Sequence, residues 1–200
     1  MKISTNTKYL SKNIISSYLI NIFHKNIINI LKNDINETDK IIDIGSGEGV
    51  IYSSISSEKM FLLDIDVNEL RCARENVPNA KVIVGDICNL PYKERVSNIV
   101  TCFEVLEHVP NYKRALKEIF RISNKYCIIS IPNEPLWRIL NIMRGAYWEN
   151  LGNTPGHINH WNKKQIINTI KQSKNVRIKK IYTPIPWILL LIEVINKSPD

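Results

Sequence analysis

An apolar run that breaks into three alternating glycines constrains this chain more than any other feature. Residues 41–44 read Ile-Ile-Asp-Ile, and Gly45, Gly47 and Gly49 follow at every second position. The pattern predicts a buried strand that turns sharply, at a place where glycine lets the backbone approach a small ligand without a Cβ in the way. The dinucleotide fingerprint needs its third glycine at position 50, where this chain has Val50, so the pattern disfavours a nicotinamide cofactor.

The rest of the chain alternates apolar runs with helical periodicity. Five strands are predicted near residues 41–44, 60–64, 81–84, 98–102 and 126–131. Strands that alternate with helices imply a parallel sheet wound with right-handed crossovers. Ligands of such sheets bind beyond the carboxyl ends of the strands, where Gly45, Asp64, Asp86 and Glu104 all fall. These residues are therefore expected to converge on one cleft.

Acidic residues follow the second and third predicted strands. Asp64 ends the apolar run at 61–64, whereas Asp66 stands three residues before Glu69 and is predicted to cap the next helix. Asp86 opens a loop that reads Gly-Asp-Ile-Cys-Asn-Leu-Pro-Tyr over residues 85–92. Asp64 is thus a ligand-binding candidate, and Asp66 a structural residue.

Together with Phe-Glu-Val-Leu-Glu-His-Val-Pro at 103–110, these segments resemble four motifs, in order, of class I (Rossmann-like) S-adenosylmethionine (SAM)-dependent methyltransferases. Within that class they resemble the methyltransferase type 11/23 and ubiquinone-pathway O-methyltransferase group. The resemblance covers residues 41–132 and thins beyond Asn133. It implies an α/β, doubly wound, mostly parallel seven-stranded sheet that ends in an antiparallel hairpin, with helices on both faces.

The same resemblance implies SAM as the cofactor. Asp64 would accept both ribose hydroxyls, Asp86 would bond the adenine amino group, and Ile87 would donate its backbone N–H. The full set of predicted cofactor-binding residues is Asp43, Gly45, Ser46, Gly47, Asp64, Ile65, Asp86, Ile87 and Glu104.

Residues 104–110 carry the predicted catalytic groups. If they begin a helix, Glu104, Glu107 and His108 lie at i, i+3 and i+4 on one face and form half of a divalent-metal site. The small-RNA 2′-O-methyltransferases have a similar Glu-x-x-Glu-His and complete their metal site with a later histidine. By that resemblance His157 is the further ligand, with His160 in reserve. A metal would suit an acceptor with vicinal hydroxyls.

Without a metal, the same residues have simpler explanations. Glutamates in a first helical turn interact favourably with the helix dipole. His108 would then be a general base or a structural residue.

One domain is expected over residues 1–200, because a chain of 200 residues with 44% hydrophobic content can bury one core well. An amphipathic helix is predicted at about 13–32, leading into the sheet and covering the cofactor, with His24 as a surface residue beside its apolar stripe. An insertion at about 133–162, with a helix at about 135–144, is expected to lie over the active site and help form the acceptor pocket.

Charge and hydropathy limit the partners. The net charge of +8 permits a nucleic acid or an anionic membrane, but no aromatic residues for base stacking are interleaved among the C-terminal lysines, which disfavours nucleic acid. No apolar run reaches the roughly 20 residues of a membrane span, and residues 1–12 lack the apolar core of a leader. The expectation is a cytoplasmic protein with at most peripheral membrane contact, and the oligomeric state stays open.

The preferred function is methyl transfer from SAM to an oxygen of a small molecule or lipid precursor, with carbon and nitrogen acceptors left open. No Asn/Asp-Pro-Pro-Tyr/Phe follows the fourth strand, which argues against the usual amino-group methylation of nucleic acids. Two alternatives remain: an RNA 2′-O-methyltransferase, favoured by the metal-like pattern and the charge, and a non-catalytic SAM-binding module.

Overall fold

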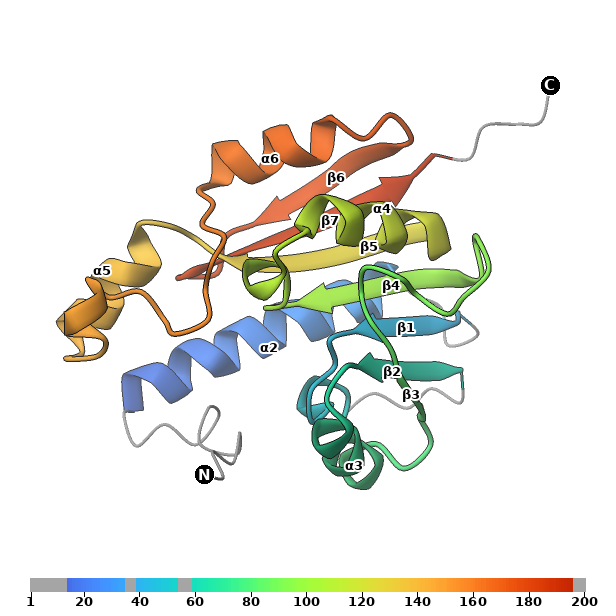
Figure 1. The fold of residues 1–200 in the computed structure, drawn as a ribbon, viewed down its shortest axis with the longest axis horizontal. Coiled ribbons are helices and arrows are strands. Elements are labelled where there is room, and N and C mark those ends of the chain that lie inside the picture. The colour runs from blue at the N-terminus through green and yellow to red at the C-terminus, as the bar shows by residue number, and fades with distance from the viewer. Residues whose placement is uncertain (1–13, 35–38, 54–58, 196–200) are drawn as a thin grey trace.

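A seven-stranded sheet forms the centre of the computed structural model, which describes residues 14–34, 39–53 and 59–195 (Figure 1). The strands are β1 (Ile41–Ile44), β2 (Met60–Asp64), β3 (Lys81–Val84), β4 (Ser97–Phe103), β5 (Ser123–Pro132), β6 (Val176–Tyr182) and β7 (Trp187–Val194). Their order is β3-β2-β1-β4-β5-β7-β6. The first five pair in parallel, while β7 runs antiparallel to both β5 and β6. The predicted fold class, including the final hairpin, is confirmed.

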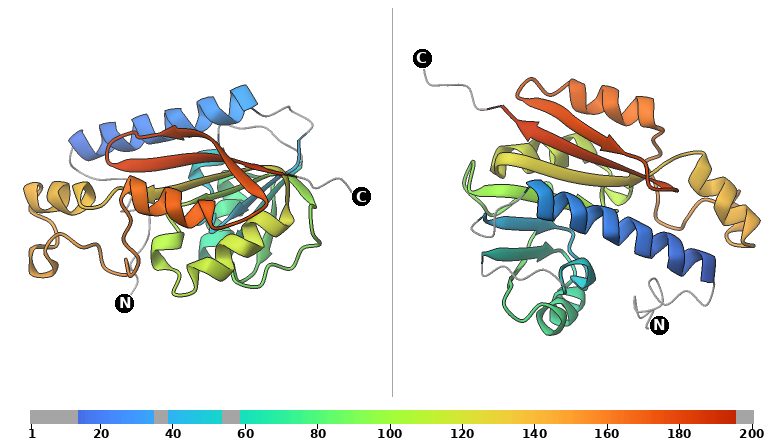
Figure 2. Two further views of the ribbon diagram at one scale, coloured as in Figure 1. Left: turned by 90° about the horizontal axis from the view of Figure 1, so that it is seen from above. Right: turned by 180° about the vertical axis from the view of Figure 1, so that it is seen from behind.

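Helices cover both faces of the sheet. They are α2 (Ile14–Asp34), α3 (Val67–Asn76), α4 (Tyr112–Ile122), α5 (Leu136–Met143) and α6 (Lys163–Lys171), with 3-10 turns η1 (Val50–Tyr52), η2 (Leu106–His108) and η3 (Trp148–Asn150). Alternate residues of β1 face opposite sides, so Ile41 packs in the core under α2, and Ile42 packs in the core under α4 and α6. Figure 2 shows α2 and α4 on opposite sides of the sheet.

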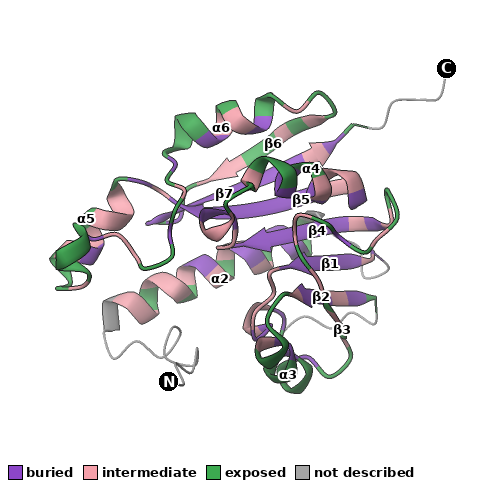
Figure 3. Cartoon of the chain, in the orientation of Figure 1, coloured by how far each residue is buried: buried purple, intermediate pink, exposed green. Residues whose placement is uncertain are grey.

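The core lies along the central strands, which are buried almost throughout (Figure 3). Near-continuous apolar runs such as Ile-Leu-Leu-Leu-Ile at 188–192 are typical of strands covered on both faces. Within the described part of the chain, no helix combines the length and the apolar character that crossing a bilayer requires.

Local sequence explains where two helices begin. The carboxylate of Asp66 accepts the backbone N–H of Asn68 at 2.8 Å, so the predicted N-cap of α3 is confirmed. Asn162 and Gln165 form a reciprocal capping box at the start of α6. The helix predicted at about 135–144 is α5, and α2 extends two residues beyond its predicted end.

The predicted helix at 104–110 is wrong. Glu104 has φ +56°, and only the single 3-10 turn η2 follows it. Pro110 disfavours helical geometry at Val109, and the side-chain amide of Asn159 donates to the carbonyls of Leu106 and Val109 in place of a further helical turn. The three predicted catalytic residues therefore do not share one helical face.

Candidate active site

Backbone contacts across two strands hold the glycine-rich turn after β1. Gly45, Gly47 and Gly49 all have positive φ, and the N–H of Gly47 donates to the Asp64 carboxylate at 2.8 Å. A Cβ on Gly45 would stand 2.3 Å from Cγ2 of Val105. Glycine is required there by both backbone conformation and space. The last residue of β2 thus stabilises the turn that follows β1.

A cavity of about 210 Å³ lies over this turn. Its lining includes six of the predicted cofactor-binding residues, Asp43, Gly45, Ser46, Gly47, Asp64 and Glu104. The Ser46 hydroxyl is buried and has no hydrogen-bond partner among the described residues, so a polar ligand would satisfy it. The three glycines of the lining, a carboxylate at Asp64 and this hydroxyl fit the polar body of SAM.

Three predicted cofactor residues lie outside the lining of this cavity. Ile65 is 73% exposed, directly after Asp64. Asp86 and Ile87 belong to the loop after β3, where the Asp86 carboxylate accepts the N–H of Cys88 at 2.8 Å. Their contact with the adenine end of the cofactor stays a prediction.

Asp43 ends a buried hydrogen-bond chain beneath the turn. The Thr101 hydroxyl donates to Asp43 at 2.6 Å, and the Tyr52 hydroxyl lies 2.6 Å from the same Thr101 oxygen. Because Thr101 has one hydroxyl proton, Tyr52 is the donor in the second bond. The pKa of the Asp43 carboxyl is raised to about 7, mainly by burial and to a smaller extent by the nearby charge of Asp64, against the lowering effect of the hydroxyls of Thr101 and Tyr52. A cationic ligand would favour the ionised form.

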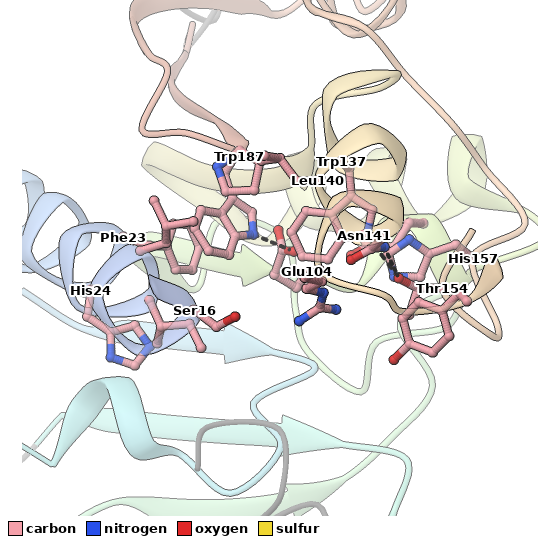
Figure 4. Close-up of a pocket in the computed structure, with 16 residues that line it drawn as sticks. Ser16, Phe23, His24, Glu104, Trp137, Leu140, Asn141, Thr154, His157 and Trp187 are labelled. Carbon is pink, nitrogen blue, oxygen red and sulfur yellow. Dashed lines mark hydrogen bonds between the residues drawn. The ribbon is translucent and has the colours of Figure 1, made fainter. Parts of the chain in front are cut away.

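Glu104 lies between two cavities and lines both of them. Its carboxylate accepts the Ser130 hydroxyl at 2.9 Å and the Trp187 indole N–H at 2.8 Å, the second of which is drawn in Figure 4. The partners come from β5 and β7, 26 and 83 residues away. These bonds fix the direction of a carboxylate at the junction of the two spaces.

The second cavity, of about 260 Å³, has an aromatic wall (Figure 4). Phe23 and Trp187 stack at 4.5 Å between centroids, and Trp137 meets Trp187 edge to face at 5.6 Å. The Trp137 indole donates to the Thr154 hydroxyl at 2.9 Å, which fixes that ring as well. His157 stacks beyond Trp137 at 6.0 Å. Rings from α2, α5 and β7 thus enclose an apolar space with polar groups around it.

The described part of α2 lines this second cavity and contributes no residue to the lining of the glycine-rich one. The expectation that this helix covers the cofactor stays a prediction. His24 lines the same cavity, and burial lowers its pKa, so its interpretation as a plain surface residue is wrong. Sequence reasoning missed the place of His24 in this cavity, although His24 directly follows Phe23, which belongs to the apolar stripe of the helix.

Glu107, His108 and His157 form a group of potential metal ligands. One ligand atom from each lies within 4.8 Å of the others, and Glu107 and His157 are buried. His108 Nδ1 is 2.9 Å from the Gly156 carbonyl, so we assign its proton to Nδ1, which orients Nε2 as the ligand atom. The Glu107 carbonyl accepts the N–H groups of Ile158 and Asn159, which holds the two segments together.

Two residues predicted as ligands stand apart from this group of described residues. Glu104 is directed to Ser130 and Trp187 because residues 104–108 do not form one helix. His160 lies 3.6 Å from Glu134 and contacts Arg138. The donor set that remains, two imidazoles and a carboxylate, suits zinc and similar divalent ions.

Comparison with known proteins agrees with this geometry. Residues 42–129 match the family described as methyltransferase domain. A putative methyltransferase of Bacillus subtilis is 31% identical over 97 residues, which are 44% of this chain and 54% of that protein. The ubiquinone biosynthesis O-methyltransferase of Acinetobacter baylyi is 30% identical over 86 residues, 39% of this chain and 36% of that one.

A solved structure shares the fold over most of its length. Magnesium protoporphyrin IX methyltransferase from Synechocystis, with bound SAH, has a TM-score of 0.68 at 14% identity over 91% of this chain and 88% of that one. The chain spans between 35% and 54% of the length of the curated relatives it matches. The fold, the glycine-rich cavity and the family match over residues 42–129 together make this chain similar to the class I, SAM-dependent methyltransferases.

Proposed function

We propose that this chain transfers the methyl group of SAM to an oxygen of a small-molecule or lipid-precursor acceptor held in the aromatic-walled cavity. The observation that carries the proposal is the position of Glu104, which lines both that cavity and the glycine-rich one. A methyl group leaving the first space must enter the second beside this carboxylate. The cavity of about 260 Å³ and its fixed rings favour an acceptor with a flat, apolar body.

Methyl transfer from a sulfonium is an in-line displacement, so the protein must orient the acceptor oxygen and remove its proton. Asp43, Gly45, Ser46, Gly47 and Asp64 hold the donor, with Ile65, Asp86 and Ile87 at its adenine end. Phe23, Trp137 and Trp187 hold the acceptor. Glu104, Glu107 and His108 are the groups within this region that can accept a proton or orient the oxygen.

The proposal includes a divalent metal on Glu107, His108 and His157. The hydrogen bond from His108 to the Gly156 carbonyl supports it, because metal-binding histidines commonly donate their other ring N–H in this way. A bound metal would lower the pKa of a neighbouring acceptor hydroxyl. Glu107 and His157 line the acceptor cavity, so such a hydroxyl could reach them.

RNA 2′-O-methylation is the second candidate function. The grouping of Glu107, His108 and His157 favours it, since it resembles the metal ligands of small-RNA 2′-O-methyltransferases. The apolar, ring-lined cavity favours a small acceptor instead. A non-catalytic SAM-binding module is the remaining alternative.

Transfer of label from methyl-labelled SAM into a host extract, fractionated into lipid, small molecules and RNA, separates these functions. Label in the lipid or small-molecule fraction supports the proposal, label in RNA supports the second candidate, and no label despite SAM binding supports a non-catalytic module. Metal content of the purified chain, measured beside His157→Ala, tests the ligand set independently of activity. Equal metal content in the two proteins would remove the metal from the proposal.

A further inference from the structure

The segment after α5 exposes an unusual number of large apolar side chains. Met143 is 75% exposed, Leu151 74% and Trp148 66%, and Ile139 and Tyr147 are exposed as well. We call these five residues the apolar rim. They lie on α5 and around η3, which project from one end of the molecule (Figures 1 and 2). Large apolar side chains that are exposed together in one segment favour a site of interaction.

Buried polar contacts hold the rim in place. The Asn141 side chain, 3% exposed, donates to the Gly152 carbonyl at 2.7 Å and to Thr154 at 3.2 Å. The Asn141 carbonyl accepts the N–H of Ala146 at 2.8 Å. Gly152 packs so closely on α5 that a Cβ there would stand 2.3 Å from the Arg138 carbonyl. The rim is thus a built feature of the fold, and its side chains are directed outward by the backbone.

Exposed basic residues stand within the rim and after it along the chain. Arg144 is exposed within it, and its guanidinium lies 5.9 Å from the Tyr147 ring centroid. Lys163 and Lys164 are exposed at the start of α6, the helix that follows this segment. Glu149 is the exposed acidic residue of the same segment. In a chain with a net charge of +8, this arrangement complements an anionic surface.

The rim adjoins the mouth of the acceptor cavity. Arg144 and Tyr147 are exposed, yet both also line that cavity, together with Leu140 and Asn141 of α5. A surface that covered the rim would therefore lie against the cavity opening.

From these contacts we propose that the apolar rim docks the protein on the interface of an anionic lipid bilayer. Tryptophan and tyrosine beside arginine and lysine are typical of segments that lie in the headgroup region. A projecting rim can enter that region, where Trp148, Leu151 and Met143 would lose their contact with water. Docking goes beyond the proposed methyl transfer and does not depend on it. It would bring the cavity opening to lipid-borne acceptors.

The test is cosedimentation of the full chain, without SAM, with vesicles of phosphatidylcholine alone or of phosphatidylcholine and phosphatidylglycerol in equal parts. We expect binding to the mixed vesicles that weakens as salt rises, and weaker binding to phosphatidylcholine. The double variant Trp148→Ser with Leu151→Ser should bind the mixed vesicles at least about tenfold more weakly. Both side chains are exposed, so its melting temperature should match the wild type.

Ile195→Ser is the matched control, because Ile195 is 44% exposed one residue beyond β7, at the opposite end of that strand from the cavity residue Trp187. It should bind like the wild type. Wild-type protein that stays in the supernatant with mixed vesicles would overturn the proposal and leave a protein partner as the occupant of the rim. Equal binding of the double variant and the wild type would also overturn it. SAM titration of the same preparations tests the methyltransferase proposal separately.

Discussion

The two cavities share Glu104, but they are built in different ways. The glycine-rich cavity is formed mainly by the turn after β1 and by residues at the carboxyl ends of β2 and β4. The acceptor cavity joins side chains from residues 16–24, 137–157 and 186–187. The family match at 42–129 contains the first set and ends before the segment that starts at Asn133. The proposed cofactor side thus lies within the matched residues, whereas most of the proposed acceptor side lies outside them, and four variants with their controls can test that contrast.

The largest expected effect is on the acceptor side. His157→Ala should lower turnover by about 10³-fold, the range for a lost proton-transfer or metal-binding group, and leave SAM affinity unchanged. His160→Ala is the control and should keep near-normal turnover, because His160 lies with Glu134 and Arg138 outside the ligand group. Turnover assays and SAM titration check both variants. A loss of SAM affinity in His157→Ala would contradict the separation of the two sides.

On the cofactor side, Gly45→Ala should weaken SAM binding by about 100-fold. Alanine at φ +73° costs about 1–2 kcal/mol, and its Cβ must also displace Val105 beside Glu104. Gly145→Ala offers a matched control, since Gly145 has φ +75° and nothing within 4 Å of an added Cβ. It should lose about 1 kcal/mol of folding stability and no SAM affinity. If Gly45→Ala bound SAM as tightly as Gly145→Ala, SAM binding would not depend on the close approach at Gly45.

Trp187→Phe tests the position of Glu104, the residue that lines both cavities. Phenylalanine keeps the ring beside Phe23 but removes the 2.8 Å hydrogen bond to Glu104. A hydrogen bond to a charged group contributes about 1.5–3 kcal/mol, so kcat/KM for the acceptor should fall at least about tenfold. Trp148→Phe, at an exposed position, should change this value less than about twofold when assayed without membranes. An unchanged kcat/KM in Trp187→Phe would show that the hydrogen bond from Trp187 to Glu104 is not needed for methyl transfer.

The smallest effect is a pH dependence of SAM binding. In the free protein, burial raises the pKa of Asp43 to about 7. The cationic groups of SAM favour the ionised carboxylate, so binding below pH 7 must release a proton, and affinity should fall by at most about tenfold per pH unit as the pH drops. Above pH 7 the carboxylate is already ionised and its contribution is constant. Calorimetric titrations of the wild type and Asp43→Asn should differ in slope only below pH 7, and parallel curves would refute the assignment.

Sequence reasoning succeeded where the signal was local. The order of apolar runs predicted the strands, and the Asp66 cap of α3 followed from its three-residue spacing to Glu69. It failed at residues 104–110, because the conformation of Glu104 depends on Ser130 and Trp187, which are remote in the chain. It also failed for His24, whose surroundings depend on how α2 packs beside β7.

The sequence by itself determined the cofactor side of this protein. The conformation of glycines after a buried strand, and of acidic residues at strand ends, depends mainly on residues nearby in the chain. A sheet with this order of elements then brings the carboxyl ends of its strands together. Only the tertiary structure decided that Glu104 lies between two cavities, that Glu107, His108 and His157 approach one another without Glu104, and that the apolar rim adjoins the cavity opening. These arrangements depend on side-chain contacts between distant segments, which spacing along the chain does not encode.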